Sequence, residues 1–367
     1  MNANKIIAML LILVNLVLVS GCSSSKPVMT TSPQHTYIKV IDCVGREVEV
    51  PQNPDRIACL FAVSAHMIAM LGDSNKIVAV SEGNKRDYMF LNIYPEIEQA
   101  RTPKGNGNFN IEELFKDPVP EVVFCYTDIV QDAKMMEKIE KFGIPVVAIS
   151  FKTMQEQQYA ISLLGQIMGR EEKAQAYNDY YNHIIELVSQ RVQDIPDSSK
   201  KTVYHAINEL LRTDTKDSLP ANWLPLTGVK NVGVSSGDAA QKNFISLEQL
   251  SFLDPEYIII NGVDVKNYIE ASEKLHHLTA YQKGNIILMP LGVSRWGHPY
   301  SIETPLAILW TAKTIYPDRF TDIDMLEETK SFYKQFFNYD LSEDEVQRIM
   351  EGKDFKKIVG GVDARRH

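Results

Sequence analysis

The chain has 367 residues, a formal net charge of −9, 44% hydrophobic residues and 23% charged residues. This length predicts two domains, each large enough to bury a core of its own. The acidic balance disfavours nucleic acids and anionic membrane surfaces as partners, because both repel a negatively charged protein.

The first 21 residues have the features of a secretory signal peptide. Lys5 precedes an apolar run from Ile6 to Val19, and the small residues Ser20 and Gly21 follow. The run is shorter than the ~20 residues that a membrane-spanning helix needs. Its removal would also remove Lys5, which makes the net charge of the remaining body −10.

Cys22 follows this segment directly and is predicted to carry a lipid. The order Val19-Ser20-Gly21-Cys22 resembles the lipobox of bacterial lipoproteins, in which the cysteine is diacylated and becomes the new N-terminus. Two or more acyl chains suffice for stable anchoring. The alternative is ordinary secretion, with Cys22 as a disulfide thiol. We therefore expect an exported protein, held at a membrane in the periplasm or on the outer cell surface.

Residues 22–36 are rich in Ser, Thr, Pro and Lys and lack periodicity, so they are predicted to form a flexible tether. Three further cysteines, Cys43, Cys59 and Cys125, lack the paired spacing of a metal site. Cys59 and Cys125 lie in apolar, strand-like runs, which favours buried and unreactive thiols. A disulfide between Cys43 and one of the other two is the alternative.

Residues 37–152 are predicted to form an N-terminal αβ lobe. A hairpin is expected from Tyr37 to Val50, broken at Gly45, and strand-like runs then alternate with helical ones up to Tyr126. Such alternation is typical of a parallel sheet covered by helices, in which ligands bind beyond the carboxyl ends of the strands. That rule selects the segments 62–66, 81–88 and 126–128 as cleft loops.

Residues 153–196 show apolar residues at helical spacing with one break at Gly169-Arg170, and they predict a long connecting helix. The alternation restarts at Thr202, so residues 197–367 are predicted to form a C-terminal αβ lobe with a helical tail. Two tail helices are expected near residues 329–337 and 342–350, the second with a capped acidic start at Ser342. The predicted fold class is α/β, with two lobes, parallel-type sheets and a cleft between them.

Several stretches carry a family resemblance. Residues 42–51, then Pro54-Asp55-Arg56-Ile57 and the segment 71–80, resemble the opening of the substrate-binding lipoproteins of metal-chelate ABC importers. Residues 164–174 resemble the entry to their connecting helix. The resemblance runs from about Tyr37 to Phe320 and implies two αβ lobes bridged by a rigid helix, with the ligand between them. It also implies an ABC permease and its ATPase as partners, and we expect a monomer.

The same resemblance implies two docking glutamates. In the vitamin B12-binding relatives, one glutamate per lobe pairs with arginines of the permease. The segments 110–114 and 245–250 resemble those places, which selects Glu112 and Glu248, with Glu113 as the alternative in the first lobe. An acidic residue in the first turn of a helix also stabilises the helix dipole, so a purely structural role is the competing interpretation.

The segment 292–305 is the richest in candidate ligand contacts, since it combines Arg295, Trp296, His298 and Tyr300 in one strand-to-helix loop. Arg295 could bind anionic oxygens, and Trp296 could form a flat wall. A core position for Trp296 and a hydrogen-bonded loop position for His298 are the alternatives. The other candidate ligand contacts are Lys85, Arg86, Tyr88, Tyr126 and Arg212, although Lys85 and Arg86 could equally form a charged surface turn.

These cations in an acidic protein favour an anionic ligand, and a ferric siderophore or similar metal chelate is the first hypothesis. Haem would use an axial Tyr or His, a corrinoid would rest on aromatic side chains, and a molybdate-type oxyanion would use several N–H donors with arginine. No protein metal site or cofactor is expected.

Three catalytic sequence motifs are missing, since there is no H-E-x-x-H, P-loop or G-x-G-x-x-G pattern. No catalytic residues are predicted. A surface enzyme or a purely structural lipoprotein is therefore the weaker hypothesis.

Overall fold

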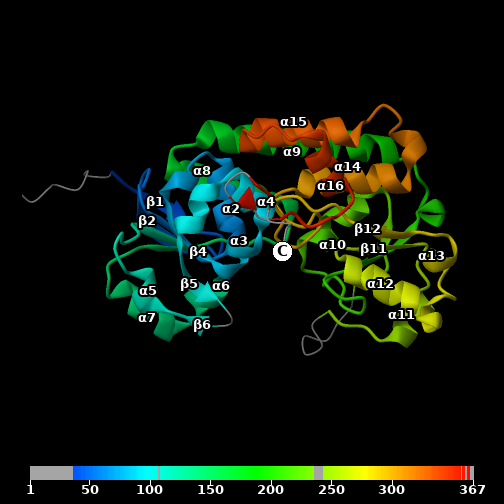
Figure 1. Cartoon of the computed structure of the whole chain (residues 1–367), viewed down its shortest axis with the longest axis horizontal. Coiled ribbons are helices and arrows are strands. Elements are labelled where there is room, and N and C mark those ends of the chain that lie inside the picture. Colours follow the sequence, from blue (N-terminus) through cyan, green and yellow to red (C-terminus); the bar gives the residue numbers. More distant parts are fainter. Residues whose placement is uncertain (1–35, 106–107, 235–242, 357, 360–361, 364–367) are drawn as a thin grey trace, which may run out of the picture. The chain divides into compact units, whose positions relative to one another are not determined.

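The computed structural model describes residues 36–105, 108–234, 243–356, 358–359 and 362–363 (Figure 1). The predicted signal peptide, Cys22 and the tether up to residue 35 lie outside the described residues. The described residues from Thr36 onward form one compact unit.

The predicted hairpin opens the fold. Strand β1 (Tyr37–Ile41) pairs antiparallel with β2 (Glu47–Pro51). Asp42 fixes the turn, because its carboxylate accepts from the backbone of Arg46 and binds the Arg46 guanidinium at 2.6 Å. Gly45 supplies the positive φ of 83° that the turn needs. The Tyr159 hydroxyl donates to Ile41 O at 2.6 Å and attaches the hairpin to the connector.

The first lobe has a six-stranded sheet in the order β6-β5-β4-β3-β7-β8, parallel except for the β5–β6 pair. Its strands are β3 (Ile57–Cys59), β4 (Ile77–Ser81), β5 (Arg101–Gly105), β6 (Asn108–Phe109), β7 (Val122–Cys125) and β8 (Val146–Ala148). Its helices are α2 (Ala62–Met70), α3 (Glu82–Arg86), α4 (Tyr88–Ile93), α5 (Ile111–Leu114), α6 (Thr127–Gln131) and α7 (Ala133–Glu140).

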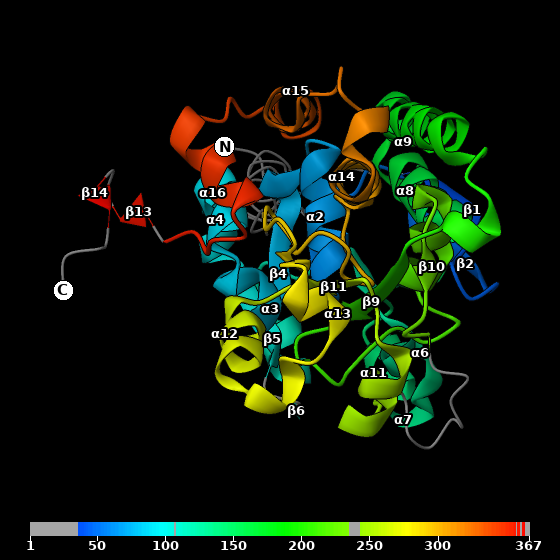
Figure 2. The ribbon, with the colours of Figure 1, turned by 90° about the vertical axis from the view of Figure 1, so that its right-hand side faces the viewer.

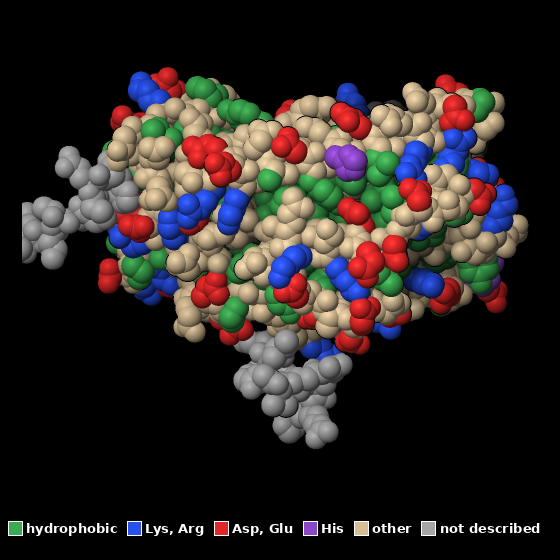
Figure 3. Space-filling model, turned by 90° about the horizontal axis from the view of Figure 1, so that it is seen from above, with side chains coloured by type: hydrophobic (Ala, Val, Ile, Leu, Met, Phe, Trp, Pro, Cys, Tyr) green, Lys and Arg blue, Asp and Glu red, His purple; other side chains and the backbone are tan. Residues whose placement is uncertain are grey.

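The connector consists of two packed helices, α8 (Met154–Met168) and α9 (Glu171–Val192). A capping box of Thr153 and Glu156 starts α8, and Gly169 ends it at a φ of 61°. Helix α9 also packs against α14 of the second lobe. Acidic and basic side chains are interspersed on the face seen in Figure 3, with no large patch of one sign.

The second lobe has a four-stranded parallel sheet in the order β10-β9-β11-β12. Its strands are β9 (Thr202–Ala206), β10 (Lys230–Asn231), β11 (Tyr257–Ile260) and β12 (Ile286–Leu288). Its helices are α10 (Leu219–Trp223), α11 (Leu247–Leu253), α12 (Val263–Ala271), α13 (Thr279–Gln282) and α14 (Thr304–Ile315).

The tail adds α15 (Met325–Phe337), α16 (Glu343–Met350) and the strands β13 (Ile358–Val359) and β14 (Val362–Asp363). Ser342 and Glu345 form the capping box expected at the start of α16. The described residues also form short 3-10 helices, which are η1 (Ser74–Lys76), η2 (Pro95–Gln99), η3 (Asp197–Ser199), η4 (Leu224–Thr227), η5 (Glu273–Leu275) and η6 (Pro317–Arg319).

One hydrophobic core runs through both lobes. It joins α2 of the first lobe, the connector, α14 and α15, and α14 is buried on almost all sides (Figure 2). Two smaller clusters cover the other face of each sheet. The α/β class with parallel sheets in two lobes is thus confirmed.

Candidate functional site

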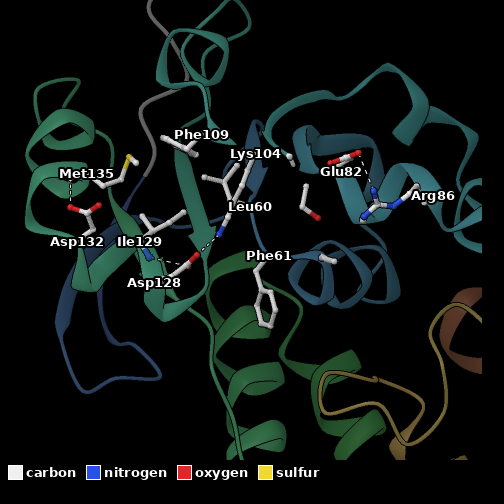
Figure 4. A pocket seen from close by; sticks show the side chains of 14 residues that line it. Leu60, Phe61, Glu82, Arg86, Lys104, Phe109, Asp128, Ile129, Asp132 and Met135 are labelled. Carbon is white, nitrogen blue, oxygen red and sulfur yellow. Dashed lines mark hydrogen bonds and ion pairs between the residues drawn. The ribbon is translucent and has the colours of Figure 1, made fainter. Parts of the chain in front are cut away.

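A cavity of about 620 Å³ opens at the carboxyl ends of the strands of the first lobe (Figure 4). It lies where the strand rule places ligands in an open parallel sheet. Phe61 follows β3, Ser81 ends β4, Lys104 lies in β5 and Asp128 follows β7. The lining residues are Leu60–Ala62, Ser81–Gly83, Arg86, Lys104–Gly105, Phe109, Asp128–Ile129, Asp132 and Met135.

The basic side chains that line the cavity are paired with acidic ones. Lys104 Nζ lies 2.6 Å from Asp128 Oδ2, and Arg86 Nη1 lies 3.0 Å from Glu82 Oε1 (Figure 4). Arg86 is therefore at the predicted place but shares its charge with a neighbouring acid.

The other three predicted contacts of the first lobe, Lys85, Tyr88 and Tyr126, do not line this cavity. Lys85 Nζ donates to the carbonyl oxygens of Ile97 and Glu98, both at 2.7 Å, so it stabilises the adjoining helical turn. Tyr88 begins α4 and is exposed. The structure thus separates the segment 85–88 into a structural lysine, a paired arginine and a surface tyrosine.

An aromatic group joins the two lobes. Tyr300, from the second lobe, donates from its hydroxyl to the Tyr126 hydroxyl at 3.0 Å. The Phe61 ring lies 4.9 Å from Tyr126 and 5.0 Å from Tyr300, centroid to centroid. Burial raises the pKa of Tyr300 above its ordinary value, so the phenol stays a neutral donor or acceptor. Of the predicted contacts, Tyr126 and Tyr300 are brought together.

The second lobe supplies the cations. Arg295 is exposed and donates from Nη1 to Asn208 Oδ1 at 2.7 Å. Arg212 is half-buried, and its Nε atom is buried without a hydrogen-bond partner among the residues that the structure describes. Both arginines act on His298: burial of this ring, together with Arg295, His205 and Arg212, lowers the pKa of His298 to about 4.

His298 is therefore neutral at pH 7, and its hydrogen bonding indicates the tautomer. Its Nδ1 accepts from the backbone N–H of Tyr300 at 3.3 Å. In a neutral ring this leaves the proton on Nε2, which makes that nitrogen a donor. A neutral imidazole donor beside two guanidinium groups suits an anion that offers several oxygen acceptors.

Trp296 does not lie in the cleft. Its side chain is fully buried in the core, and its Nε1–H donates to Glu303 Oε1 at 3.0 Å. The expected flat wall is thus replaced by the aromatic group of Phe61, Tyr126 and Tyr300, because the Trp296 ring points into the lobe that carries it.

Several polar residues of the second lobe were not predicted as site residues. Asn208 and Asn261 follow the neighbouring strands β9 and β11, and Asn261 Oδ1 accepts from the Asn208 N–H at 2.8 Å. The fully buried His205 places Nδ1 at 3.1 Å from both oxygens of Asp214. A polar residue at the end of a buried strand was the available signal for the two asparagines. His205 was available from the sequence as an axial ligand for haem, but nothing predicted its pairing with Asp214.

The two predicted docking glutamates are exposed. Glu112 lies in α5 of the first lobe, whereas Glu113 pairs with Lys116. Glu248 lies in the first turn of α11, where its own backbone N–H and the Ser246 hydroxyl lower the pKa of its carboxyl. Phe252, one turn further along α11, is 89% exposed. In Figure 1, α5 and α11 both lie on the side away from α9.

In the described part of the chain, Cys43, Cys59 and Cys125 are free thiols. Burial raises the pKa of Cys43 to about 11 and the pKa values of Cys59 and Cys125 to about 12. In the described part of the chain, no helix is long and apolar enough to span a membrane.

Residues 57–291 match the model of the periplasmic binding protein family. The chain belongs to this family. The match confirms the resemblance noted in the sequence, and it makes this periplasmic binding protein the solute-binding component of an ABC transporter rather than an enzyme. Proteins of this type are exported, bind small ligands and work with a permease and an ATPase.

Two curated relatives are similar over most of this periplasmic binding protein. The molybdate-binding protein MolA of Haemophilus influenzae is 24% identical over 337 residues, which cover 84% of this chain and 93% of the relative. The iron-uptake system-binding protein of Bacillus subtilis is 26% identical over 273 residues, covering 72% and 81%.

Solved structures show the same fold. A periplasmic solute-binding protein from Veillonella parvula has a TM-score of 0.74 at 25% identity, covering 86% of this chain and 97% of its own. MolA bound to molybdate has a TM-score of 0.73 at 22% identity, covering 83% and 99%.

Proposed function

We propose that this periplasmic binding protein captures an anionic, oxygen-rich metal complex, and that an iron(III)-siderophore chelate is the first candidate. The observation that carries the proposal is the positive field at the second lobe. Burial, together with Arg295, His205 and Arg212, lowers the pKa of His298, so both guanidinium groups act on this ring. The Nε atom of Arg212 is also buried without a hydrogen-bond partner among the described residues. A ligand with anionic oxygens would supply the missing negative charge.

The size of the first-lobe cavity supports a chelate. About 620 Å³ lies within the range of ~300–1,000 Å³ that is usual for drug-sized ligands. Phe61 lines this cavity, and Tyr126 and Tyr300 contact Phe61 from outside the lining. These rings would contact the apolar parts of such a ligand, while Arg212 and Arg295 of the second lobe would bind its carboxylate or catecholate oxygens. The similarity to an iron-uptake binding protein agrees with this choice.

A molybdate-type oxyanion is the second candidate, and the buried N–H donors favour it. Arg212 Nε and Asn261 Nδ2 are both buried without a partner among the described residues. A small oxyanion satisfies several N–H groups at once, which a buried donor requires. The similarity to MolA supports this candidate. Trp296, one of the aromatic side chains on which a corrinoid would rest, lies in the core.

A titration separates these ligands. Purified residues 23–367 would be titrated with ferric citrate, a ferric catecholate siderophore, haemin, cobalamin and molybdate, using tryptophan fluorescence and calorimetry. We expect micromolar or tighter binding of a ferric chelate; binding of molybdate alone would select the second candidate. Binding of haemin or cobalamin alone would contradict the proposal.

We also propose that Glu112 and Glu248 dock the protein onto its permease, as the resemblance implied. Their exposure on two short helices, one in each lobe, supports this role. Phe252 lies one helical turn from Glu248, so α11 presents an acid and an aromatic ring together. Exposed aromatic rings are common at protein interfaces.

The substitution Glu248→Arg should lower ligand uptake by whole cells about fivefold. It would replace the proposed ion pair with a permease arginine by repulsion between two positive charges. Ligand affinity of the purified protein should stay unchanged. Glu186→Arg, at an exposed position on α9, is the matched control and should leave uptake at the wild-type level. Equal uptake by both variants would contradict docking through Glu248.

We also propose that Cys22 carries a lipid anchor and that the protein is a monomer. We expect the full chain, expressed in a bacterium, to partition into the detergent phase, since two acyl chains give stable membrane binding. Recovery in the aqueous phase would indicate ordinary secretion instead. Gel filtration of residues 23–367 would test the expected monomer.

A further inference from the structure

The loop that carries Arg295 and His298 is held by groups outside the matched residues 57–291. This cleft loop, residues 290–300, runs from β12 toward α14. Its Leu291 N–H donates to Ile349 O of α16 at 3.0 Å, and its Val293 N–H donates to the Tyr333 hydroxyl of α15 at 2.8 Å. Two helices of the tail, α15 and α16, thus supply acceptors for the start of the cleft loop.

Glu303 supplies a further acceptor for this loop. This fully buried carboxylate accepts from Ser294 N at 2.7 Å, from Ser294 Oγ at 3.0 Å and from Trp296 Nε1 at 3.0 Å. The Tyr333 hydroxyl donates to Glu303 Oε1 at 2.6 Å. Burial raises the pKa of Glu303 above its ordinary value, while these hydrogen bonds oppose that shift.

Gly292 shows how closely these groups approach the loop backbone. A Cβ atom at this position would lie 2.0 Å from Glu303 Oε1 and 2.2 Å from the Tyr333 hydroxyl oxygen. Real side chains do not tolerate such distances, so the backbone at 292 fits directly against the Tyr333–Glu303 pair. A shift of either group would therefore move the loop.

We infer that the C-terminal helices are part of the ligand-binding apparatus, with Tyr333 as a positioning residue that acts through Glu303 on the loop bearing Arg295 and His298. This inference rests on the proposed function for its effect on affinity. Buried, fully bonded networks fix the groups attached to them, and binding groups depend on such support. Arg295 itself is exposed and bonded through one guanidinium nitrogen to Asn208, so its backbone must be held by other contacts.

The test compares two variants that each remove one buried hydroxyl from α15. Tyr333→Phe removes the group that bonds Val293 and Glu303. Thr329→Val removes a hydroxyl that donates to Met325 O within the same helix and to Met350 Sδ of α16 at 3.8 Å, but makes no bond to the loop. We expect Tyr333→Phe to speed hydrogen exchange of the peptide spanning residues 290–300 about tenfold and to weaken ligand binding about tenfold. Thr329→Val should change neither quantity.

The probes for affinity are molybdate and ferric citrate, and exchange is measured by mass spectrometry in the absence of ligand. Equal effects of both variants would mean that the tail is destabilised in general, and this would overturn the inference. Unchanged exchange and affinity in Tyr333→Phe would overturn it as well. If the wild-type protein binds neither probe, the proposed ligand class fails, while the exchange data still decide whether Tyr333 positions the loop.

Discussion

Replacement of Arg212 by glutamine should weaken binding of the anionic ligand by about 30- to 150-fold, or about 2–3 kcal/mol. Its Nε atom is buried and has no partner within the described residues, so the ligand would be the first group to satisfy it. Arg295→Gln should cost only about fivefold, because this arginine is exposed and already donates to Asn208. Calorimetry with the ferric chelate or oxyanion that binds the wild-type protein measures both changes.

Arg191→Gln is the matched control. Arg191 lies on α9 and pairs with Asp322 at 2.6 Å, far along the chain from any predicted ligand contact. Its loss should leave affinity unchanged. A wild-type affinity in Arg212→Gln would show that the buried guanidinium does not face the ligand, and the anion site would have to be sought elsewhere.

Acid should destabilise the protein through His298 by about 3 kcal/mol between pH 7 and pH 4. The pKa of His298 is lowered to about 4 in the folded protein, from 6.5 in its ordinary state. Below pH 6.5, His298 therefore binds a proton in the unfolded chain but not in the folded one. The stabilising contribution is complete above pH 6.5 and is lost as the pH falls toward 4.

Urea unfolding at several pH values checks this prediction. The free energy of unfolding of His298→Gln should fall less steeply between pH 7 and pH 4 than that of the wild-type protein. His277→Gln, at an exposed position, controls for the removal of a histidine as such. Parallel curves for wild type and His298→Gln would mean that the ring is already charged or is free to reach water.

Much of the fold could be predicted because it depends on patterns along the chain. Alternating apolar runs predicted parallel sheets in two lobes, and the cap at Ser342 predicted the start of α16. Strand β8 (Val146–Ala148) was missed because it is only three residues long and depends on pairing with β7. The β5–β6 hairpin was missed for a similar reason, since Pro103 and Gly105 weaken its strand pattern.

The candidate site was predicted in part. The strand-end rule found Arg86, which lines the cavity, and Tyr126, which meets Tyr300. It could not give side-chain direction, so Lys85 and Trp296 were expected in the cleft although one stabilises a turn and the other fills the core. Contacts between distant segments, such as that of Tyr333 with Glu303, leave no periodic trace in the sequence.

The core that runs through α2, α9, α14 and α15 has a consequence for protein engineering. A biosensor built by exchanging one lobe with that of a relative would cut through this shared packing, and mismatched volumes on either side would cost stability. The exchangeable part of the molecule is therefore smaller than a lobe. Ligand preference would be easier to transplant through single cleft loops, with the supporting tail taken from the same parent.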